Sequence, residues 1–303
     1  MIDTTPHAPA HRPPAVAGAF YPAEPVRLRA LVAALLVRAD EAHGPRRRPG
    51  PTGILVPHAG LVYSGVVAAA AWRLVASRTV VILGTNHSAP LDGVAAWDGG
   101  PWSTPLGDVA VDQELTEEIV ALGPPFAPNR RAHRDEHSIE VQLPLLATVA
   151  PRARIVALSV AAGSGEAAIA AGTLLGGLLA TRRQAGDDVM LAISTDLAHY
   201  PTHTDALRAT DLLVPAIVGV EPAGVARRER ALTRGGFRGM ACGMCGIQPT
   251  VLGLAALAAM GVTGGTVLAS ATSADAGGPE DRTVGYLAAE FRGPVDATTE
   301  TPG

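Results

Sequence analysis

Three short apolar runs in this 303-residue chain are each followed by a histidine. The runs and the polar side chains beyond them are residues 53–57 with His58, residues 79–84 with His87, and residues 189–194 with Asp196 and His199. Short β-branched runs bounded by Gly, Pro or Asn are typical of strands that are buried on both faces of a parallel sheet. Ligands of open α/β sheets bind just beyond the carboxyl ends of such strands. We therefore expect these side chains to converge on one metal ion or one substrate.

Strand-like and helix-like apolar periods alternate along the rest of the chain. Further strands are expected near residues 154–160, 265–270 and 283–291, and helices near 28–36, 64–76, 112–122, 137–149, 165–184, 203–232 and 249–260. The segment through Trp97, Trp102 and Pro105 is expected to be loop. Such alternation favours helices on both faces of a mostly parallel or mixed sheet. We find no internal repeat and no long linker, so we predict a single α/β domain over residues 14–292 with flexible tails at 1–13 and 293–303.

Charge and composition argue against several classes of function. The net charge of −4 gives no reason to expect binding to nucleic acid or to an anionic membrane. No apolar stretch approaches the roughly 18 residues that cross a bilayer, and the first residues lack the features of a signal peptide. Two cysteines are too few for a secreted disulfide scaffold, which favours a reducing cytoplasm. All 24 basic residues are arginine, so neither a P-loop lysine nor a lysine Schiff base is available.

The histidines at the strand ends have both a functional and a structural interpretation. His58 and His87 are each predicted to lie in a strand-to-helix turn with small neighbours, which would let a ligand come close. A histidine that caps a helix or is hydrogen-bonded beneath a loop would explain either one alone. Asp196 and His199 are three residues apart, so a helical turn would place them on one face, where the carboxylate would raise the basicity of the imidazole. The alternative is an N-cap aspartate beside a surface histidine.

Cys242 and Cys245 form a C-x-x-C pair with three interpretations: a redox dithiol, part of a zinc site, or one functional cysteine with a bystander. A structural Cys₄ zinc site is excluded because the chain has only two cysteines. Pro249 predicts a helix that begins just after Cys245. A helix N-terminus lowers the pKa of a thiol and favours the thiolate that binds metal, so we choose Cys245 as the candidate ligand. A small buried apolar cysteine is the alternative.

Acidic and aromatic residues complete the set of candidates. Glu136 and Glu140 open a predicted amphipathic helix, where acidic residues are often only partners of the helix dipole, and we interpret them in this way. Tyr21, Trp102 and Tyr286 could line a pocket, although core packing is the usual role of such side chains.

Several of these segments match a known family in order and in spacing. They are residues 14–23, the turns at His58 and His87, residues 104–107, 136–140 and 194–200, Cys245-Gly246 with Pro249, and residues 284–286. Through them the chain resembles the Memo family, known in bacteria and archaea as AmmeMemoRadiSam system protein B, over residues 12 to 292. That family in turn resembles the class III extradiol dioxygenases, which open catechol rings with non-haem Fe(II). The resemblance implies an extradiol-dioxygenase-like α/β domain with helices that flank a central sheet.

The resemblance also implies a ligand set. His58 and His87 would be metal ligands, with Cys245 in the place of the dioxygenase glutamate. His199, supported by Asp196, would be the catalytic acid or base. The candidate substrate-binding residues are His137 and Tyr21. A His₂Cys site accepts Fe(II) but also suits copper, especially Cu(I), and zinc.

These expectations leave three functions open. The first is a redox-linked metal-binding protein, with iron or copper and a small-molecule or peptide ligand in the strand-end cleft. The second is a non-catalytic protein that works through an AMMECR-type or a radical-SAM partner. The third is a zinc-dependent hydrolase. Cys242 would then either join the metal site or form a reversible disulfide with Cys245.

Overall fold

A mixed sheet forms the centre of the computed structural model, which describes residues 11–44, 50–161, 163 and 165–294. Over that part of the chain the sheet contains the strands β1 (Gly53–Val56), β2 (Thr79–Thr85), β3 (Gly93–Ala96), β6 (Phe126–Pro128), β7 (Arg154–Ala161), β8 (Val189–Ser194), β9 (Gly265–Thr272) and β10 (Gly285–Phe291). Their order across the sheet is β6-β3-β7-β2-β8-β1-β10-β9. A separate antiparallel ribbon pairs β4 (Trp102–Thr104) with β5 (Gly107–Val109).

The four central strands, β7, β2, β8 and β1, are parallel to one another. Every residue of β1 and β8 is buried, and so are the first six residues of β2, because helices cover both faces of the sheet. This burial explains why the three runs contain few polar residues. The carboxyl ends of the central strands lie at the same edge, as predicted.

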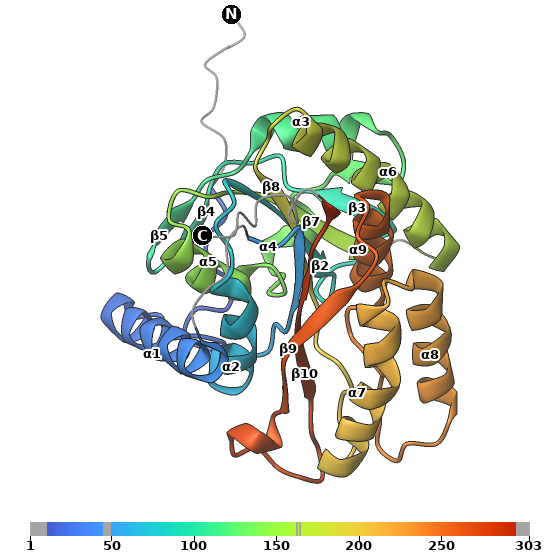
Figure 1. Ribbon diagram of the computed structural model, residues 1–303. Coiled ribbons are helices and arrows are strands. Elements are labelled where there is room, and N and C mark those ends of the chain that lie inside the picture. The colour runs from blue at the N-terminus through green and yellow to red at the C-terminus, as the bar shows by residue number, and fades with distance from the viewer. Residues whose placement is uncertain (1–10, 45–49, 162, 164, 295–303) are drawn as a thin grey trace, which may run out of the picture.

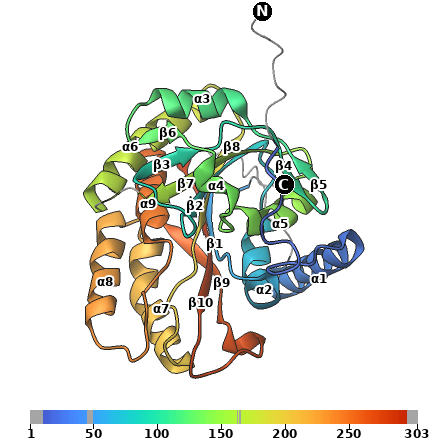
Figure 2. The ribbon, with the colours of Figure 1, turned by 180° about the vertical axis from the view of Figure 1, so that it is seen from behind.

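Helices pack on both faces of the sheet. They are α1 (Pro25–His43), α2 (Leu61–Trp72), α3 (Gln113–Ala121), α4 (Arg131–Arg134), α5 (Leu143–Val149), α6 (Gly165–Gln184), α7 (His203–Val218), α8 (Pro222–Arg234) and α9 (Ile247–Ala259). Helices α1, α2 and α5 lie on one side, and α6 to α9 lie on the other (Figures 1 and 2). Each side has its own apolar core, with Leu28 and Trp72 in one and Leu175 and Leu252 in the other. The predicted single α/β domain with a mixed sheet is confirmed.

Two local predictions are wrong. The segment around Trp102, expected to be loop, forms β4 and β5, and it lies between β3 and β6 in the sequence. Strands of three or four residues are too short to show a hydrophobic period. Arg12, placed by sequence in a flexible tail, is buried, and its Nε donates a hydrogen bond to the His133 carbonyl at 2.8 Å. Of the predicted tails, residues 1–10 and 295–303 lie outside the described residues.

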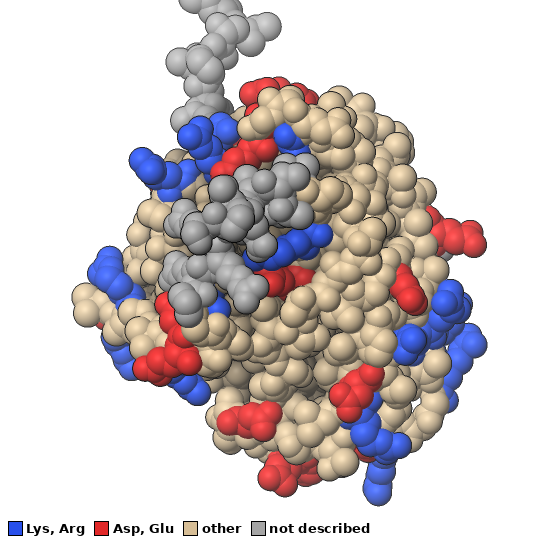
Figure 3. Space-filling view, in the orientation of Figure 1, with Lys and Arg blue, Asp and Glu red and all other residues tan. Residues whose placement is uncertain are grey.

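Arginine and acidic side chains are interspersed on the face shown in Figure 3. A cavity of about 480 Å³ at the amino ends of β2 and β8 is lined by such charges. They pair with one another: Arg154 lies 3.0 Å from Asp112, and Arg182 lies 2.9 Å from Asp187. No helix in the described ranges combines the length and the apolar character needed to cross a bilayer.

Helices α6 and α9 pack with their backbones in direct contact at Gly176. A Cβ atom at this position would clash with the backbone of Ala256, whereas a Cβ at the neighbouring Gly177 would meet no atom within 4 Å. We expect Gly176→Ala to destabilise the protein by about 1–3 kcal/mol because the helices must separate. Gly177→Ala should stabilise it by up to about 1 kcal/mol through helix propensity. Urea denaturation of both variants measures the difference, and equal effects would contradict the close helix contact.

Candidate metal centre

A cavity of about 510 Å³ lies beyond the carboxyl ends of β1, β2 and β8. The side chains with metal-binding or acid–base chemistry that line it are His58, His87, His137, Asp196, His199 and Cys245. Aromatic rings from Phe20, Tyr63, Tyr200 and Tyr286 form much of the remaining wall. The predicted convergence at the strand ends is therefore present.

The buried hydroxyl of Ser194 sets the tautomer of His58. Ser194 Oγ donates its single proton to the Ser138 carbonyl at 2.7 Å and accepts from Gln142 Nε2 at 3.0 Å. It also lies 3.0 Å from His58 Nδ1, and because its proton is already used, Nδ1 must be the donor. The lone pair of His58 therefore lies on Nε2, which is 3.2 Å from Cys245 Sγ. This is the tautomer that binds metal through Nε2.

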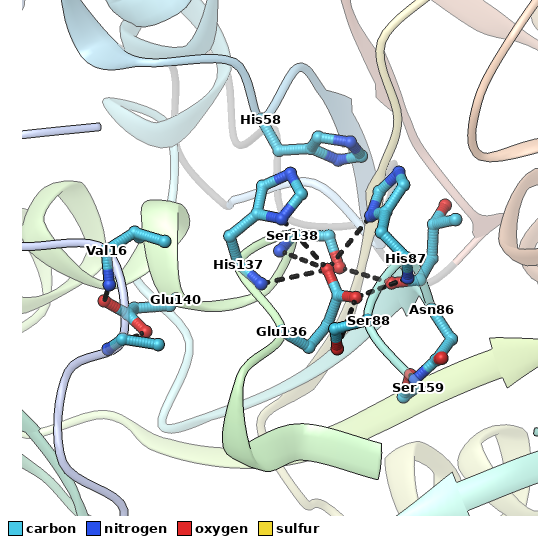
Figure 4. Close-up of polar contacts among 12 residues, drawn as sticks. Val16, His58, Asn86, His87, Ser88, Glu136, His137, Ser138, Glu140 and Ser159 are labelled. Carbon is cyan, nitrogen blue, oxygen red and sulfur yellow. Dashed lines mark hydrogen bonds and ion pairs between the residues drawn. The ribbon is translucent and has the colours of Figure 1, made fainter. Parts of the chain in front are cut away.

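Glu136 fixes the position of the His87 ring through hydrogen bonds. Its carboxylate accepts hydrogen bonds from both the backbone N–H and the Nδ1 of His87, the latter at 3.0 Å. The backbone N–H groups of His137 and Ser138 also donate to it, at 2.9 and 3.0 Å (Figure 4). Burial alone would raise the pKa of Glu136, but the hydrogen bonds from His87 hold it below its usual range. Since an ionised carboxylate only accepts, Nδ1 of His87 carries a proton and Nε2 is the ring nitrogen that can face a metal, as in many metal-bound histidines.

His137 completes a cluster of three imidazoles. Its ring stacks on that of His87 with a centroid distance of 4.6 Å and lies 5.4 Å from that of His58. One ligand atom from each of the three histidines lies within 4.8 Å of the other two. Burial, followed by the charges of its neighbours, lowers the pKa of His58 well below its usual value.

A second group shares His58 but uses other partners. One ligand atom each from His58, Asp196 and Cys245 also falls within 4.8 Å of the others. Asp196 Oδ1 accepts hydrogen bonds from the backbone N–H of His58 at 2.8 Å and of Ala59 at 3.2 Å, so it fixes the turn that carries His58. Burial raises the pKa of Asp196 above its usual value.

The three predicted ligands line one cavity but are divided between the two groups. His58 belongs to both groups, His87 is grouped with His137, and Cys245 is grouped with Asp196. His87 also differs from the prediction in its local structure, because β3 rather than a helix follows its turn. The length of β2 and the Glu136 contact place it at the cavity.

The predicted effect of the helix N-terminus on Cys245 is wrong. Helix α9 begins at Ile247, close to the predicted start. However, burial and then the charge of Asp196 raise the pKa of the Cys245 thiol well above its usual value. A thiolate at this position therefore needs a cation beside it. Burial also raises the pKa of Cys242, to about 11.

Asp196 and His199 do not lie on one turn of helix as predicted. Residues 195–200 follow β8 without forming a helix, and His199 donates its backbone N–H to the Cys242 carbonyl at 3.0 Å. Its Nε2 is buried and has no hydrogen-bond partner among the described residues. A buried polar atom without a partner is costly unless a ligand satisfies it. Burial also lowers the pKa of His199, which favours the neutral ring.

Tyr21 lies beside the cavity rather than in its wall. Its hydroxyl donates to Glu140 Oε1 at 2.6 Å, and Glu140 also pairs with Arg12. The neighbouring residue Phe20 lines the cavity instead, with its ring 4.7 Å from that of His137. The structure brings together all of the predicted site residues except Tyr21.

Comparison with known proteins identifies the family of the chain. A family model described as Memo-like protein matches residues 12–290. A MEMO1 family protein of Methanopyrus kandleri is 34% identical over 93% of this chain and 99% of its own length. Relatives from Aquifex aeolicus and Sulfolobus acidocaldarius, both named MEMO1 family protein, are each 33% identical over 92% of this chain and over 98% and 99% of their own lengths.

Among solved structures, an uncharacterised protein of Escherichia coli K12 superposes on this chain with a TM-score of 0.49. It is 14% identical in sequence, and the match covers 80% of this chain and 99% of that protein. We draw no conclusion on function from it. The family model covers nearly the whole described domain, and the relatives match it at close to full length. The chain therefore belongs to the Memo family.

Proposed function

We propose that this protein binds redox-active iron or copper in the strand-end cavity, with His58, His87 and Cys245 as ligands. The observation that carries the proposal is the pair of oriented imidazoles next to a thiol. His58 directs Nε2 at the sulfur of Cys245 at 3.2 Å, and His87 is held at Nδ1 by Glu136. Two imidazole nitrogens and one thiolate suit Fe(II), copper and also zinc.

The cavity residues have separate roles in this proposal. A bound iron or copper ion would supply Lewis acidity and electron transfer, with coordination positions left for a ligand. His199, whose pKa is lowered by burial and whose Nε2 has no hydrogen-bond partner in the described part of the chain, would take up or release a proton at the bound small molecule or peptide. Asp196 would keep His58 in position through the two backbone N–H groups that it accepts. The aromatic wall would exclude water from the reacting group, and the activity would be that of a dioxygenase-like oxidoreductase.

Elemental analysis tests the proposal most directly. Untagged protein, purified without affinity metals, is expected to contain iron or copper at close to one ion per chain. Zinc at that level would instead support the hydrolase interpretation of the same three ligands. Metal content no higher than in a blank purification, together with no uptake on anaerobic addition of Fe(II) or Cu(I), would refute the proposal.

Replacement of the thiol gives a sharper test of the ligand set. We expect Cys245→Ser to weaken Cu(I) binding by more than about 10-fold, because the variant lacks the soft sulfur donor that Cu(I) prefers. Cys242→Ser is the matched control, since Cys242 belongs to neither group of potential ligands. Competition with a chromogenic Cu(I) chelator measures both affinities. Equal affinities for the two variants would show that Cys245 is not the copper ligand.

A further inference from the structure

We infer that the cavity offers a second, all-nitrogen coordination mode in which His58, His87 and His137 hold a borderline divalent cation without Cys245. The inference shares His58 and His87 with the proposed function and therefore rests on metal binding by these two histidines. The all-nitrogen mode differs from the proposed function in the third ligand. His137 is assigned to the metal rather than to a substrate, and the thiol is left free.

The geometry of the three imidazoles supports this mode. They come from three separate parts of the fold and converge above Glu136, as Figure 4 shows. Their ring centroids are 4.6 to 5.4 Å apart, and one nitrogen from each lies within 4.8 Å of the others. A single ion can bridge such a set after small side-chain rotations. Imidazole is the donor that Zn²⁺, Co²⁺ and Cu²⁺ commonly accept in proteins.

One carboxylate oxygen orients two of the rings. Glu136 Oε1 lies 3.0 Å from Nδ1 of His87 and 3.4 Å from Nδ1 of His137. With both Nδ1 atoms directed at the same oxygen, both Nε2 atoms point away from Glu136. Ser194 orients the third ring, that of His58. The arrangement directs Nε2 of His87 and His137 away from Glu136, and in this mode the Cys245 thiol turns aside from Nε2 of His58, which it contacts at 3.2 Å.

The buried carboxylate of Glu136, whose side-chain ion pairs are with His87 and His137, fits a cation held by these rings. Its side chain is only 1% exposed. Within the described residues, its carboxylate is bound by backbone N–H groups, the Ser88 hydroxyl and imidazoles, and by no arginine side chain. Arg12 donates to the backbone carbonyl of Glu136 and forms its ion pair with Glu140. A buried carboxylate is normally paired or bound to a metal centre, and an ion held by the rings that Glu136 orients would balance its charge.

The two modes differ in the ions that they prefer. Cu(I) is soft and favours the thiolate of Cys245, whereas borderline divalent ions are satisfied by three imidazoles. The identity of the third ligand would therefore depend on the ion. His58 and His87, common to both modes, would remain bound in either case.

Cobalt titration separates the two modes, because Co²⁺ bound to thiolate gives an intense near-ultraviolet charge-transfer band and Co²⁺ bound only to imidazole does not. Metal-free full-length protein is titrated with Co²⁺ and, separately, with Cu(I). We expect His137→Ala to weaken Co²⁺ binding by more than about 10-fold and Cu(I) binding by less than about twofold. Cys245→Ser should show the opposite pattern. The wild-type Co²⁺ complex should lack the thiolate band.

Three further variants guard against misleading results. His203→Ala removes a histidine that is hydrogen-bonded to Thr272 outside the cavity, so it should bind both ions like the wild type. If His137→Ala does not fold, as judged by circular dichroism, His137→Asn replaces it. Glu136→Gln removes the negative charge and one of the two acceptor oxygens, so it should weaken Co²⁺ binding more than Cu(I) binding.

The outcomes distinguish this inference from the proposed function. A thiolate band in the wild-type Co²⁺ complex, or Co²⁺ binding that survives loss of His137 but not loss of Cys245, overturns the all-nitrogen mode and leaves the His₂Cys proposal intact. Failure of the wild-type protein to bind either ion above background overturns both.

Discussion

Replacement of Arg12 by alanine is expected to destabilise the protein by about 3–5 kcal/mol, the usual cost of removing one member of a buried ion pair. Arg12 Nη1 lies 2.5 Å from Glu140 Oε2, and both side chains are at most 1% exposed. The other guanidinium nitrogens donate to the carbonyls of His133 and Glu136. Without Arg12, the Glu140 carboxylate stays buried with only the hydrogen bonds from Tyr21 and two backbone N–H groups.

Urea denaturation with linear extrapolation measures this loss. Arg134→Ala is the matched control, because the side chains of Arg134 and Asp135 are 69% and 64% exposed and such a pair contributes little. The control should remain within about 0.5 kcal/mol of the wild type. An Arg12→Ala variant as stable as the control would mean that the buried pair contributes no net stability.

The fold could be predicted from the sequence where long buried strands determine it. The runs that form β1, β2 and β8 are almost entirely apolar because both of their faces are covered, and this pattern is local and visible in sequence. The strands β4 and β5, three residues each, depend on pairing with each other. Arg12 is similar: its burial depends on Glu140, which is 128 residues away, and nothing in the sequence around Arg12 indicates it.

In the candidate site, too, features set by local sequence could be predicted and features set by distant contacts could not. The convergence of His58, His87 and His199 follows from strand direction, so it could be predicted. The role of Glu136 could not, because an acidic residue near a helix start has the same local appearance whether it interacts with the helix dipole or with a histidine 49 residues away. The helical turn expected for Asp196 and His199 is absent because this segment forms backbone bridges with Cys242 and Val284, which are distant in sequence.

The segment from Glu136 to Glu140 links the N-terminal part of the domain to the cavity. Glu140 pairs with Arg12, and Glu136 directs its carboxylate at His87 while its backbone carbonyl also accepts from Arg12. Glu136 and Glu140 are both buried. Glu140 neutralises Arg12, and Glu136 orients the ring of His87. The two glutamates therefore have separate contacts, one with the Arg12 ion pair and one with a cavity histidine, that their shared motif does not reveal.

Removal of the His58 imidazole is expected to abolish both kinds of metal binding. His58 is the only residue common to the two groups of potential ligands among the described residues, so His58→Ala should weaken Co²⁺ and Cu(I) binding alike. The loss should exceed the about 10- to 100-fold that removal of an outer-shell partner costs. His137→Ala and Cys245→Ser should each affect mainly one ion. Competition titrations with both ions on the same preparations measure the pattern.

Ser194→Ala separates the ligand itself from its orientation. The variant keeps the His58 ring but removes the hydroxyl that makes Nδ1 the donor, so the ring can adopt either tautomer. We expect both ions to bind about 10- to 100-fold more weakly, between the wild type and His58→Ala. Nitrogen-15 NMR of the imidazoles should show a single Nδ1–H tautomer for His58 in the metal-free wild type and a mixture in the variant. Cu(I) affinity unchanged in His58→Ala would place the ion away from the strand ends and remove the basis for both coordination modes.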